Sequence, residues 1–210
     1  MKCIILIAAP AAGKGTIAKY LQDKYNYKHL STGNLLRDEV KKSTEIGIKA
    51  SSYIDKGLLV PDDVIVKLFE EKLSKMRSNL VLDGFPRNLN QAKLLDSFID
   101  NNNIEVEKII FIDVLKEVAI SRITSRLTCE ECGSVYNKNI ITDNKCTNCG
   151  GNLVSRKDDT EESYLVRYNE FVDVTMPIID YYKDRVTTIY NNSTIEDMYL
   201  NIDNLLKGDK

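Results

Sequence analysis

The sequence has few features of a membrane, exported or nucleic-acid-binding protein. No stretch reaches the roughly 18–20 consecutive apolar residues of a membrane span, and the apolar run that begins at Cys3 is too short for a signal peptide. The net charge is only −2, so no excess of one sign points to a nucleic acid or a lipid surface. Internal repeats and low-complexity linkers are absent too. We therefore expect a cytoplasmic protein, and 210 residues with 43% hydrophobic content can bury a sizeable core.

Histidine occurs once, as His29. It lies in a short extended stretch, and no neighbour in the sequence suggests a charge-relay partner. We therefore expect a structural role beside a strand, rather than catalysis, for this residue.

The most informative stretch is the beginning of the chain. Lys2 is followed by the apolar, isoleucine-rich run at residues 3–7, which predicts a buried parallel strand over residues 2–7. A loop of small residues with Gly13 and Lys14 follows, and then a helix begins. This layout cradles phosphate groups through backbone N–H groups, the helix N-terminus and a lysine. An ordinary strand-to-helix turn with a surface lysine is the alternative.

Two alanines stand where this phosphate-binding motif usually has glycine. They are Ala8 and Ala11. If the backbone at either position requires a positive φ, alanine costs about 1–2 kcal/mol there.

Strands and helices alternate along the rest of the chain. Further strands are predicted at residues 28–30, 79–83, 106–114 and 186–190. Helices are predicted at residues 17–25, 34–40, 46–56, 64–75, 89–101, 117–127, 158–183 and 195–206. This alternation predicts an α/β fold, a parallel sheet flanked by helices on both faces. Residues 34–75 are helical without a strand, as an inserted subdomain would be.

The ends of the helices carry their own signals. Ser31 or Thr32 can cap the helix at residues 34–40. Gly57 is expected to end the helix at residues 46–56, and Pro177 to kink the long helix at residues 158–183.

Charged side chains stand where such a sheet places its ligands. Asp83 ends a buried strand and could orient a magnesium-bound water, while Arg87 could grip a phosphate. Arg122 and Arg126 are four residues apart on a predicted helix and would share a face. Solvated surface charges are the alternative in both places.

Four of the five cysteines lie close together in the sequence. Cys129 and Cys132 form one Cys-x-x-Cys pair, and Cys146 and Cys149 form another after thirteen intervening residues. Without an export signal, this clustering favours a metal over disulfides. Four thiolates fill the tetrahedral shell of Zn²⁺, so the predicted site is structural rather than catalytic. A redox pair or unrelated thiols are the alternative, and Cys3 is expected in the core.

Several motifs, taken together, resemble those of adenylate kinases, in that family's order and over nearly the whole chain. These motifs are Gly13–Thr16, Ser31–Arg37, Lys56–Asp62, Leu82–Arg87 with Gln91, and Arg156–Asp159 with Arg167. The segment Cys129–Cys149 looks like the zinc-bearing lid of the family's long bacterial form.

The resemblance implies the P-loop nucleoside monophosphate kinase fold, with a parallel five-stranded sheet. A core domain would comprise residues 1–30, 76–127 and 160–210. A helical insert at residues 31–75 would bind AMP, and residues 128–159 would form a zinc-ribbon-like lid.

The resemblance also implies a reaction and its site residues. The reaction is reversible transfer of the γ-phosphoryl group from Mg²⁺-ATP to AMP, giving two ADP, by a monomer that binds neither nucleic acid nor membrane. ATP would contact Ala11, Ala12, Gly13, Lys14, Gly15, Thr16, Arg126, Val135, Tyr136 and Ser193. AMP would contact Thr32, Arg37, Leu58, Leu59, Val60, Gly84, Phe85, Pro86, Arg87, Gln91, Arg156 and Arg167. The catalytic charges would be Lys14, Arg87, Arg122, Arg126, Arg156 and Arg167.

Three alternatives stay open at this point. Another nucleoside monophosphate, such as UMP or CMP, could be the acceptor, but Gln91 can pair with an adenine edge as both donor and acceptor. Because Ala8 and Ala11 replace glycines and Asn34 stands where the family often has Asp, a nucleotide-binding regulator with little turnover is a second alternative. A nucleic-acid-binding zinc ribbon is the weakest, since acidic residues such as Glu130 and Glu131 leave that segment without a basic face.

Overall fold

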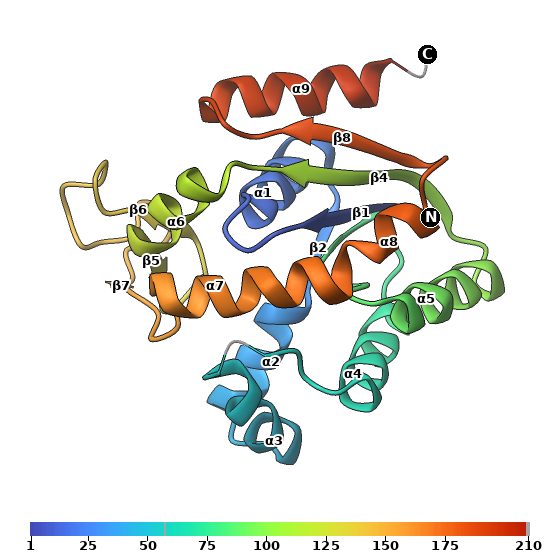
Figure 1. Cartoon of the computed structure of the whole chain (residues 1–210), viewed down its shortest axis with the longest axis horizontal. Coiled ribbons are helices and arrows are strands. Elements are labelled where there is room, and N and C mark those ends of the chain that lie inside the picture. The colour runs from blue at the N-terminus through green and yellow to red at the C-terminus, as the bar shows by residue number, and fades with distance from the viewer. Residues whose placement is uncertain (57, 209–210) are drawn as a thin grey trace.

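The computed structural model describes residues 1–56 and 58–208. Its centre is a five-stranded parallel sheet in the order β2-β3-β1-β4-β8 (Figure 1). The strands are β1 (Lys2–Ala8), β2 (Lys28–Ser31), β3 (Leu80–Asp83), β4 (Glu105–Asp113) and β8 (Val186–Tyr190). The α/β class, the parallel sheet and the number of strands predicted from the sequence are confirmed.

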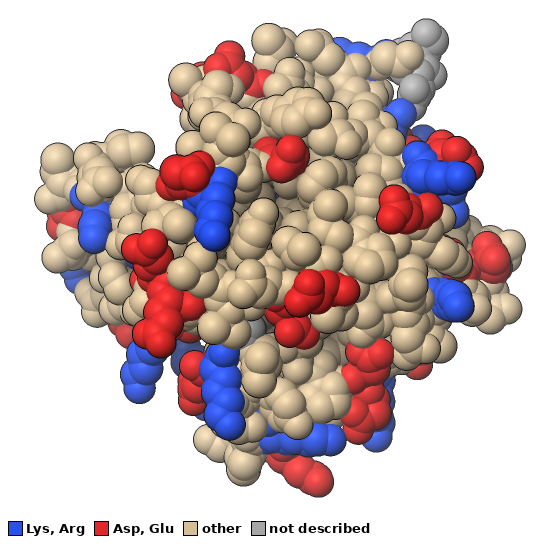
Figure 2. Space-filling model, in the orientation of Figure 1, with Lys and Arg blue, Asp and Glu red and all other residues tan. Residues whose placement is uncertain are grey.

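Helices cover both faces of this sheet (Figure 1). They are α1 (Lys14–Tyr25), α2 (Thr32–Lys41), α3 (Glu45–Ile54), α4 (Asp62–Ser74), α5 (Leu89–Asn101), α6 (Lys116–Thr124), α7 (Glu161–Glu170), α8 (Pro177–Tyr181) and α9 (Ile195–Lys207). No helix of the described residues is long and apolar enough to cross a bilayer. On the face shown in Figure 2, basic and acidic side chains are interspersed rather than segregated.

The central strand divides the core into two layers. Successive side chains of a strand point to opposite faces, so Cys3 and Ile5 pack on one face of β1, and Ile4 and Leu6 pack on the other. The first layer is covered mainly by α2, α4, α5 and α8, and the second by α1, α6 and α9. Cys3 is buried, as predicted.

The last helix is held to the first by a polar cluster. The Asp203 carboxylate of α9 accepts hydrogen bonds from the Tyr20 hydroxyl at 2.7 Å and the Tyr25 hydroxyl at 2.8 Å, and it pairs with Lys24. The Tyr20 and Tyr199 rings stack with centroids 3.9 Å apart. These contacts complement the apolar face that α9 presents to the core.

Helix caps explain several boundaries. The Ser31 hydroxyl accepts a hydrogen bond from the Asn34 N–H, so Ser31 is the cap of α2. Thr32 is already helical, and its hydroxyl donates to the Gly84 carbonyl. The predicted helix end at Gly57 lies outside the described residues, and the helix itself ends at Ile54. The described part of residues 34–75 contains helices and no strand, as predicted.

The prediction that Arg122 and Arg126 share a helix face is wrong. Helix α6 ends at Thr124, and Arg126 begins strand β5 (Arg126–Cys129). Strand β5 pairs antiparallel with β6 (Val135–Asn137) and β7 (Leu153–Val154) in a separate small sheet. At the helix end the Ser125 hydroxyl donates to the Ser121 carbonyl, which competes with further helical turns.

The long helix predicted at residues 158–183 is also interrupted. It begins only at Glu161, because Thr160 caps α7. Residues Phe171–Thr175 form a π-helical turn in which the Met176 N–H donates to the Phe171 carbonyl at 2.8 Å. Pro177, which has no N–H to donate, then starts α8. The break near the proline is therefore as predicted, but the continuous helix is not.

Candidate active site

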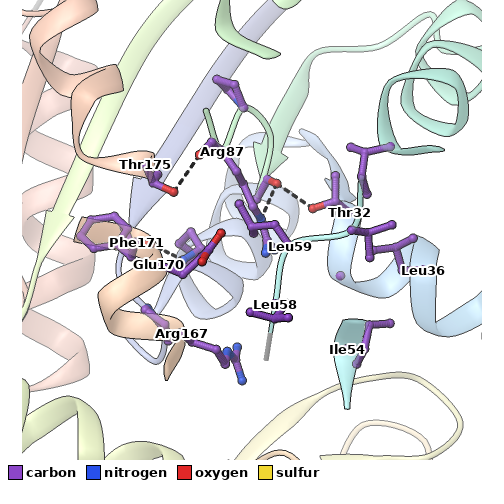
Figure 3. A pocket seen from close by; sticks show the side chains of 18 of the residues that line it. Thr32, Leu36, Ile54, Leu58, Leu59, Arg87, Arg167, Glu170, Phe171 and Thr175 are labelled. Atoms are coloured by element: carbon purple, nitrogen blue, oxygen red, sulfur yellow. Dashed lines mark hydrogen bonds between the residues drawn. The ribbon is translucent and has the colours of Figure 1, made fainter. Parts of the chain in front are cut away.

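A cavity of about 140 Å³ opens at the carboxyl end of β1. Ala8 and Lys14 line its floor, while Thr32 and Leu36 of α2 line one side. Figure 3 shows Arg167 and Phe171 on the side opposite Thr32 and Leu36, with Arg87 between the two sides. Open α/β sheets bind ligands at this edge.

The loop between β1 and α1 has the backbone of a phosphate cradle. Ala11 has a φ of 59° and Gly13 a φ of 95°, whereas Ala8 is the last residue of β1 and has no positive φ. A Cβ atom on Gly13 would lie 2.6 Å from Nδ2 of Asn191, so only glycine fits there. Of the two alanine substitutions noted in the sequence, the one at residue 11 therefore carries backbone strain.

Lys14 and Asn191 hold this loop in place. The Lys14 ammonium donates to the carbonyl oxygens of Ala8 at 2.9 Å and Ala9 at 3.2 Å. The Asn191 amide, buried at the end of β8, donates to the Ala12 carbonyl at 2.8 Å. The sequence analysis missed Asn191, although its position directly after a predicted strand could have identified it.

Three half-buried cations of the site have lowered pKa values. Burial lowers the pKa of Lys14 to about 8, with Asp83 opposing the shift. Burial and Arg167 lower the pKa of Arg87 to about 10. Burial, together with Arg37 and Arg126, lowers the pKa of Arg156 to about 9. Lys14 and Arg87 line the cavity together with Arg37 and Arg167, and this gathering of positive charge suits a strongly anionic ligand.

Two of the arginines are held by neighbouring carboxylates. The Arg126 guanidinium makes a two-pronged contact with Asp159, including a 2.8 Å hydrogen bond from Nε to Oδ2. Arg167 Nη1 donates to Asp158 Oδ2 at 2.9 Å. Both carboxylates belong to a motif noted in the sequence, but no role was assigned to them there.

The remaining arginines have neutral partners. Arg37 donates to the side-chain oxygen of Asn34 at 2.6 Å, and Arg156 donates to the Thr128 hydroxyl at 3.1 Å. Arg122 Nη2 lies 3.4 Å from Asn191 Oδ1. Arg122 Nη1 is buried with no hydrogen-bond partner among the described residues. A buried guanidinium nitrogen without a protein partner is available to donate to an anion.

Asp83 is paired with the single histidine. His29 Nε2 lies 3.0 Å from Asp83 Oδ2, across the neighbouring parallel strands β2 and β3. Burial would raise the pKa of Asp83, but the hydrogen bond with His29 and the charge of Lys14 outweigh it and lower the pKa. His29 lies within β2, in the extended stretch expected from the sequence, and its carboxylate partner is not a neighbour in the sequence. Strand pairing supplies a partner 54 residues away.

The turn after β3 is tightly packed. Gly84 has a φ of 82°, and its carbonyl accepts hydrogen bonds from the Thr32 hydroxyl and from Arg87 Nε, both at 2.8 Å. The Phe85–Pro86 peptide bond is cis. Phe85 is buried and stacks on Phe69 of α4 with centroids 4.1 Å apart, so it faces the core.

Gln91 lines the cavity but is already engaged by protein groups. Its Oε1 accepts from the Arg87 backbone N–H at 2.7 Å, and its Nε2 donates to Asp62 Oδ1 at 2.7 Å. Neither partner was anticipated from the sequence, and the contact with Asp62 joins segments 29 residues apart, which leaves no local signal.

The four clustered cysteines meet in the small sheet. The sulfur atoms of Cys129, Cys132, Cys146 and Cys149 all lie within 4.8 Å of one another. The Cys129–Cys149 and Cys132–Cys146 sulfur pairs are each 3.5 Å apart. Four thiolates about 2.3 Å from one zinc ion would lie about 3.8 Å apart, so this arrangement fits Zn²⁺.

The predicted site residues divide into two groups. Those that line the cavity are Lys14, Thr32, Arg37, Leu58, Leu59, Val60, Gly84, Pro86, Arg87, Gln91 and Arg167. Those outside it are Ala11, Ala12, Gly13, Gly15, Thr16, Phe85, Arg122, Arg126, Val135, Tyr136, Arg156 and Ser193.

Two residues predicted to contact ATP, Val135 and Tyr136, lie in the small sheet, away from the cavity. The Tyr136 hydroxyl lies 3.2 Å from Cys146 Sγ, against the cysteine cluster, and Val135 is exposed.

Comparisons with known proteins point to one family. The family model described as "Adenylate kinase" matches residues 6–187. The chain is 40% identical to the adenylate kinase of Clostridium tetani over 210 residues, covering 97% of each chain. It is 39% identical to that of Alkaliphilus oremlandii, covering 98% of this chain and 99% of the relative. With the adenylate kinase of Archaeoglobus fulgidus it shares 43% identity over 187 residues, covering 87% of this chain and 86% of that protein.

Proposed function

The chain belongs to the adenylate kinase family, and from this we propose which of its residues carry out the transfer of a phosphoryl group from ATP to AMP. The observation that carries the assignment is the set of four cations that line the cavity at the carboxyl end of β1, namely Lys14, Arg37, Arg87 and Arg167. Phosphoryl transfer requires positioning and charge neutralisation rather than a covalent group from the protein. A site of this kind supplies both.

The ATP phosphates bind at the loop that precedes α1. The backbone N–H groups and the α1 N-terminus face the phosphates, and Lys14 exchanges the carbonyls of Ala8 and Ala9 for phosphate oxygens. Arg122 Nη1, which has no partner among the described residues, pairs with a phosphate oxygen. Ala11–Thr16, Arg126, Val135, Tyr136 and Ser193 complete the proposed ATP site.

Adenylate kinases use Mg²⁺ with ATP, and the metal neutralises charge on the phosphates. Asp83 is the residue of this chain that would orient the metal's water, because it ends β3 beside Lys14 and has a lowered pKa. His29 holds the Asp83 carboxylate in that orientation.

AMP binds in the cavity on the side of α2. Arg37 and Arg87 bind its phosphate, and Thr32 and the turn at Gly84–Pro86 shape the site. The apolar side chains of Leu58, Leu59 and Val60 line the wall against which the base packs. Gln91 then recognises the edge of the base.

The lid and the insert close over both nucleotides and exclude water, which prevents hydrolysis of ATP. In this proposal the core comprises residues 1–30, 76–127 and 160–210, the insert residues 31–75 and the lid residues 128–159. On closure Arg156 and Arg167 bind the transferring phosphoryl group. To do so, Arg167 exchanges its hydrogen bond to the Asp158 carboxylate for one to the phosphoryl group.

The cysteine cluster holds one structural Zn²⁺ in the lid. Cys129, Cys132, Cys146 and Cys149 fill a tetrahedral shell and leave no position for water or substrate. Two buried and two exposed thiols fit a metal-bound cluster in a reducing cytoplasm, where disulfides are rare. We propose that the protein acts as a monomer in the cytoplasm.

A coupled assay tests this assignment directly. The purified protein is incubated with ATP, Mg²⁺ and, in turn, AMP, UMP, CMP or GMP, and ADP formation is followed. We expect rapid turnover with AMP, which chelation of Mg²⁺ abolishes. Binding of ATP without ADP formation would overturn the catalytic assignment, and a preference for UMP or CMP would overturn the assignment of Gln91.

A further inference from the structure

We propose that Asp62 sets the base specificity of the acceptor site, as a positioning residue that fixes the orientation of the Gln91 side-chain amide. The inference rests on the proposed function, in which Gln91 recognises the base of AMP. It adds a residue that does not itself contact the base.

The Gln91 amide is held at both of its polar ends. Its Oε1 accepts from the Arg87 backbone N–H, and its Nε2 donates to the Asp62 carboxylate, each at 2.7 Å. A backbone N–H can only donate and a carboxylate can only accept, so the chemistry of the partners determines which end of the amide is oxygen. If the Gln91 amide were flipped, both hydrogen bonds would be lost and its oxygen would face the Asp62 carboxylate. Gln91 is only 2% exposed, so water cannot replace the lost bonds.

Asp62 is itself fixed by neighbouring amides. Asn88 Nδ2 donates to Oδ1 and Asn90 Nδ2 donates to Oδ2, each at 2.9 Å. Asn88 in turn caps α5 by accepting the Gln91 backbone N–H at 2.8 Å. Burial would raise the pKa of Asp62, but the hydrogen bonds from Asn90, Gln91 and Asn88 outweigh it and lower the pKa. The carboxylate is therefore an acceptor at neutral pH.

The fixed amide has one N–H and one oxygen lone pair left for a ligand in the cavity. Adenine presents an exocyclic amino donor next to the N1 acceptor. Hypoxanthine presents a 6-oxo acceptor next to an N1–H donor, which is the reverse order in the same positions. The fixed amide pairs with the first base and mispairs with the second, and only a flip of Gln91 would reverse that preference. The neighbouring apolar wall, formed by Leu58 and Val60, has no side-chain polar group that would distinguish the two rings.

The test compares AMP with IMP as phosphoryl acceptors, since the two differ only at this edge. We expect the ratio of kcat/KM for AMP to that for IMP to fall about five- to twentyfold in Asp62→Ala, as one orienting hydrogen bond is lost. Asp62→Leu removes the acceptor without leaving a void, and the same fall is expected. Asp62→Asn retains an acceptor oxygen and should recover most of the preference.

Asp63→Ala is the matched control. Asp63 is the adjacent carboxylate, but it is exposed and pairs with Lys49 at 3.2 Å. In Asp63→Ala the ratio of kcat/KM for AMP to that for IMP should stay within twofold of the wild-type ratio. A ratio measured on one preparation does not depend on the folded fraction, so a purely structural role for Asp62 would lower both rates and leave the ratio unchanged.

The outcomes separate this inference from the proposed function. If the wild type does not phosphorylate AMP, or if Gln91→Leu leaves its KM for AMP unchanged, the proposed function fails and the inference fails with it. If both expectations hold but Asp62→Ala and Asp62→Leu keep the wild-type ratio within twofold, only the role of Asp62 is overturned.

Discussion

Alanine at position 11 strains the phosphate loop, and glycine should relieve that strain. The φ of 59° at Ala11 lies in the left-handed region, which costs an L-residue about 1–2 kcal/mol. Glycine removes this cost but adds about 0.4–1 kcal/mol of conformational freedom to the unfolded chain. It also removes a half-buried methyl group worth about 0.4 kcal/mol. The net free energy of unfolding should therefore stay unchanged or rise by up to about 1 kcal/mol.

Ala12→Gly is the matched control for this change. Ala12 is 1% exposed and has no positive φ, so glycine there relieves no strain and loses a fully buried methyl group. That methyl is worth about 0.8 kcal/mol, and the unfolded-state term is the same as at position 11. The two variants should therefore differ by about 2 kcal/mol, with Ala11→Gly the more stable.

Thermal unfolding of the nucleotide-free protein, followed by circular dichroism, measures this difference. For a chain of this size about 1 kcal/mol corresponds to 2–4 °C, so the midpoints should lie about 4–8 °C apart. Turnover of Ala11→Gly should be preserved or improved, because glycine adopts every backbone geometry that alanine does. Equal losses of stability in the two variants would refute the argument from strain.

Three further predictions concern separate parts of the molecule. Lys14→Met should keep the fold but lower kcat in the coupled assay more than tenfold, equivalent to about 1.4 kcal/mol; a smaller loss would contradict its role. Elemental analysis of the wild type should find one Zn²⁺ per chain, and a metal-free wild type would contradict the structural site. Replacing Cys146 and Cys149 by Ser should abolish this metal binding and lower the melting temperature, while phosphoryl transfer persists at low temperature. The hydrogen bonds from Lys24 and Tyr20 lower the pKa of Asp203 to about 2, so its stabilisation is present above pH 4 and disappears as the pH falls toward 2. The melting temperature of Asp203→Asn should therefore lie below that of wild type at pH 7 and approach it below pH 4, and a gap independent of pH would contradict this.

Hydrophobic patterning was enough to predict most of the fold. The five strands and the helix at residues 89–101 follow from periodicity and turn residues, which are local signals. The errors lie where tertiary pairing decides the structure. Arg126 continues a helical pattern, but its backbone pairs with Asn137 of β6 and becomes a strand. The small three-stranded sheet that imposes this pairing has no hydrophobic run of its own.

The candidate site was predictable in its residue types but not in their partners. Glycines, lysine and arginines at motif spacing identified the anion site, and the structure places many of them around one cavity. The contacts of His29 with Asp83 and of Gln91 with Asp62 could not be predicted, because they join residues that lie close only after folding. The positive φ at Ala11 was foreseen as a possibility, and the backbone geometry decided between it and Ala8.

The pairing of Arg126 with Asp159 and of Arg167 with Asp158 means that two arginines of the proposed site carry their own counterions. A phosphate that enters displaces a tethered carboxylate rather than dissolved chloride, so the exchange takes place within the protein. Such a swap releases few ions to the solvent, so these two arginines should contribute less to the salt dependence of binding than Arg37 and Arg156, whose partners are neutral. The displaced carboxylates stay beside the arginines and compete with the product for them, which favours departure of the nucleotide once the phosphoryl group has moved.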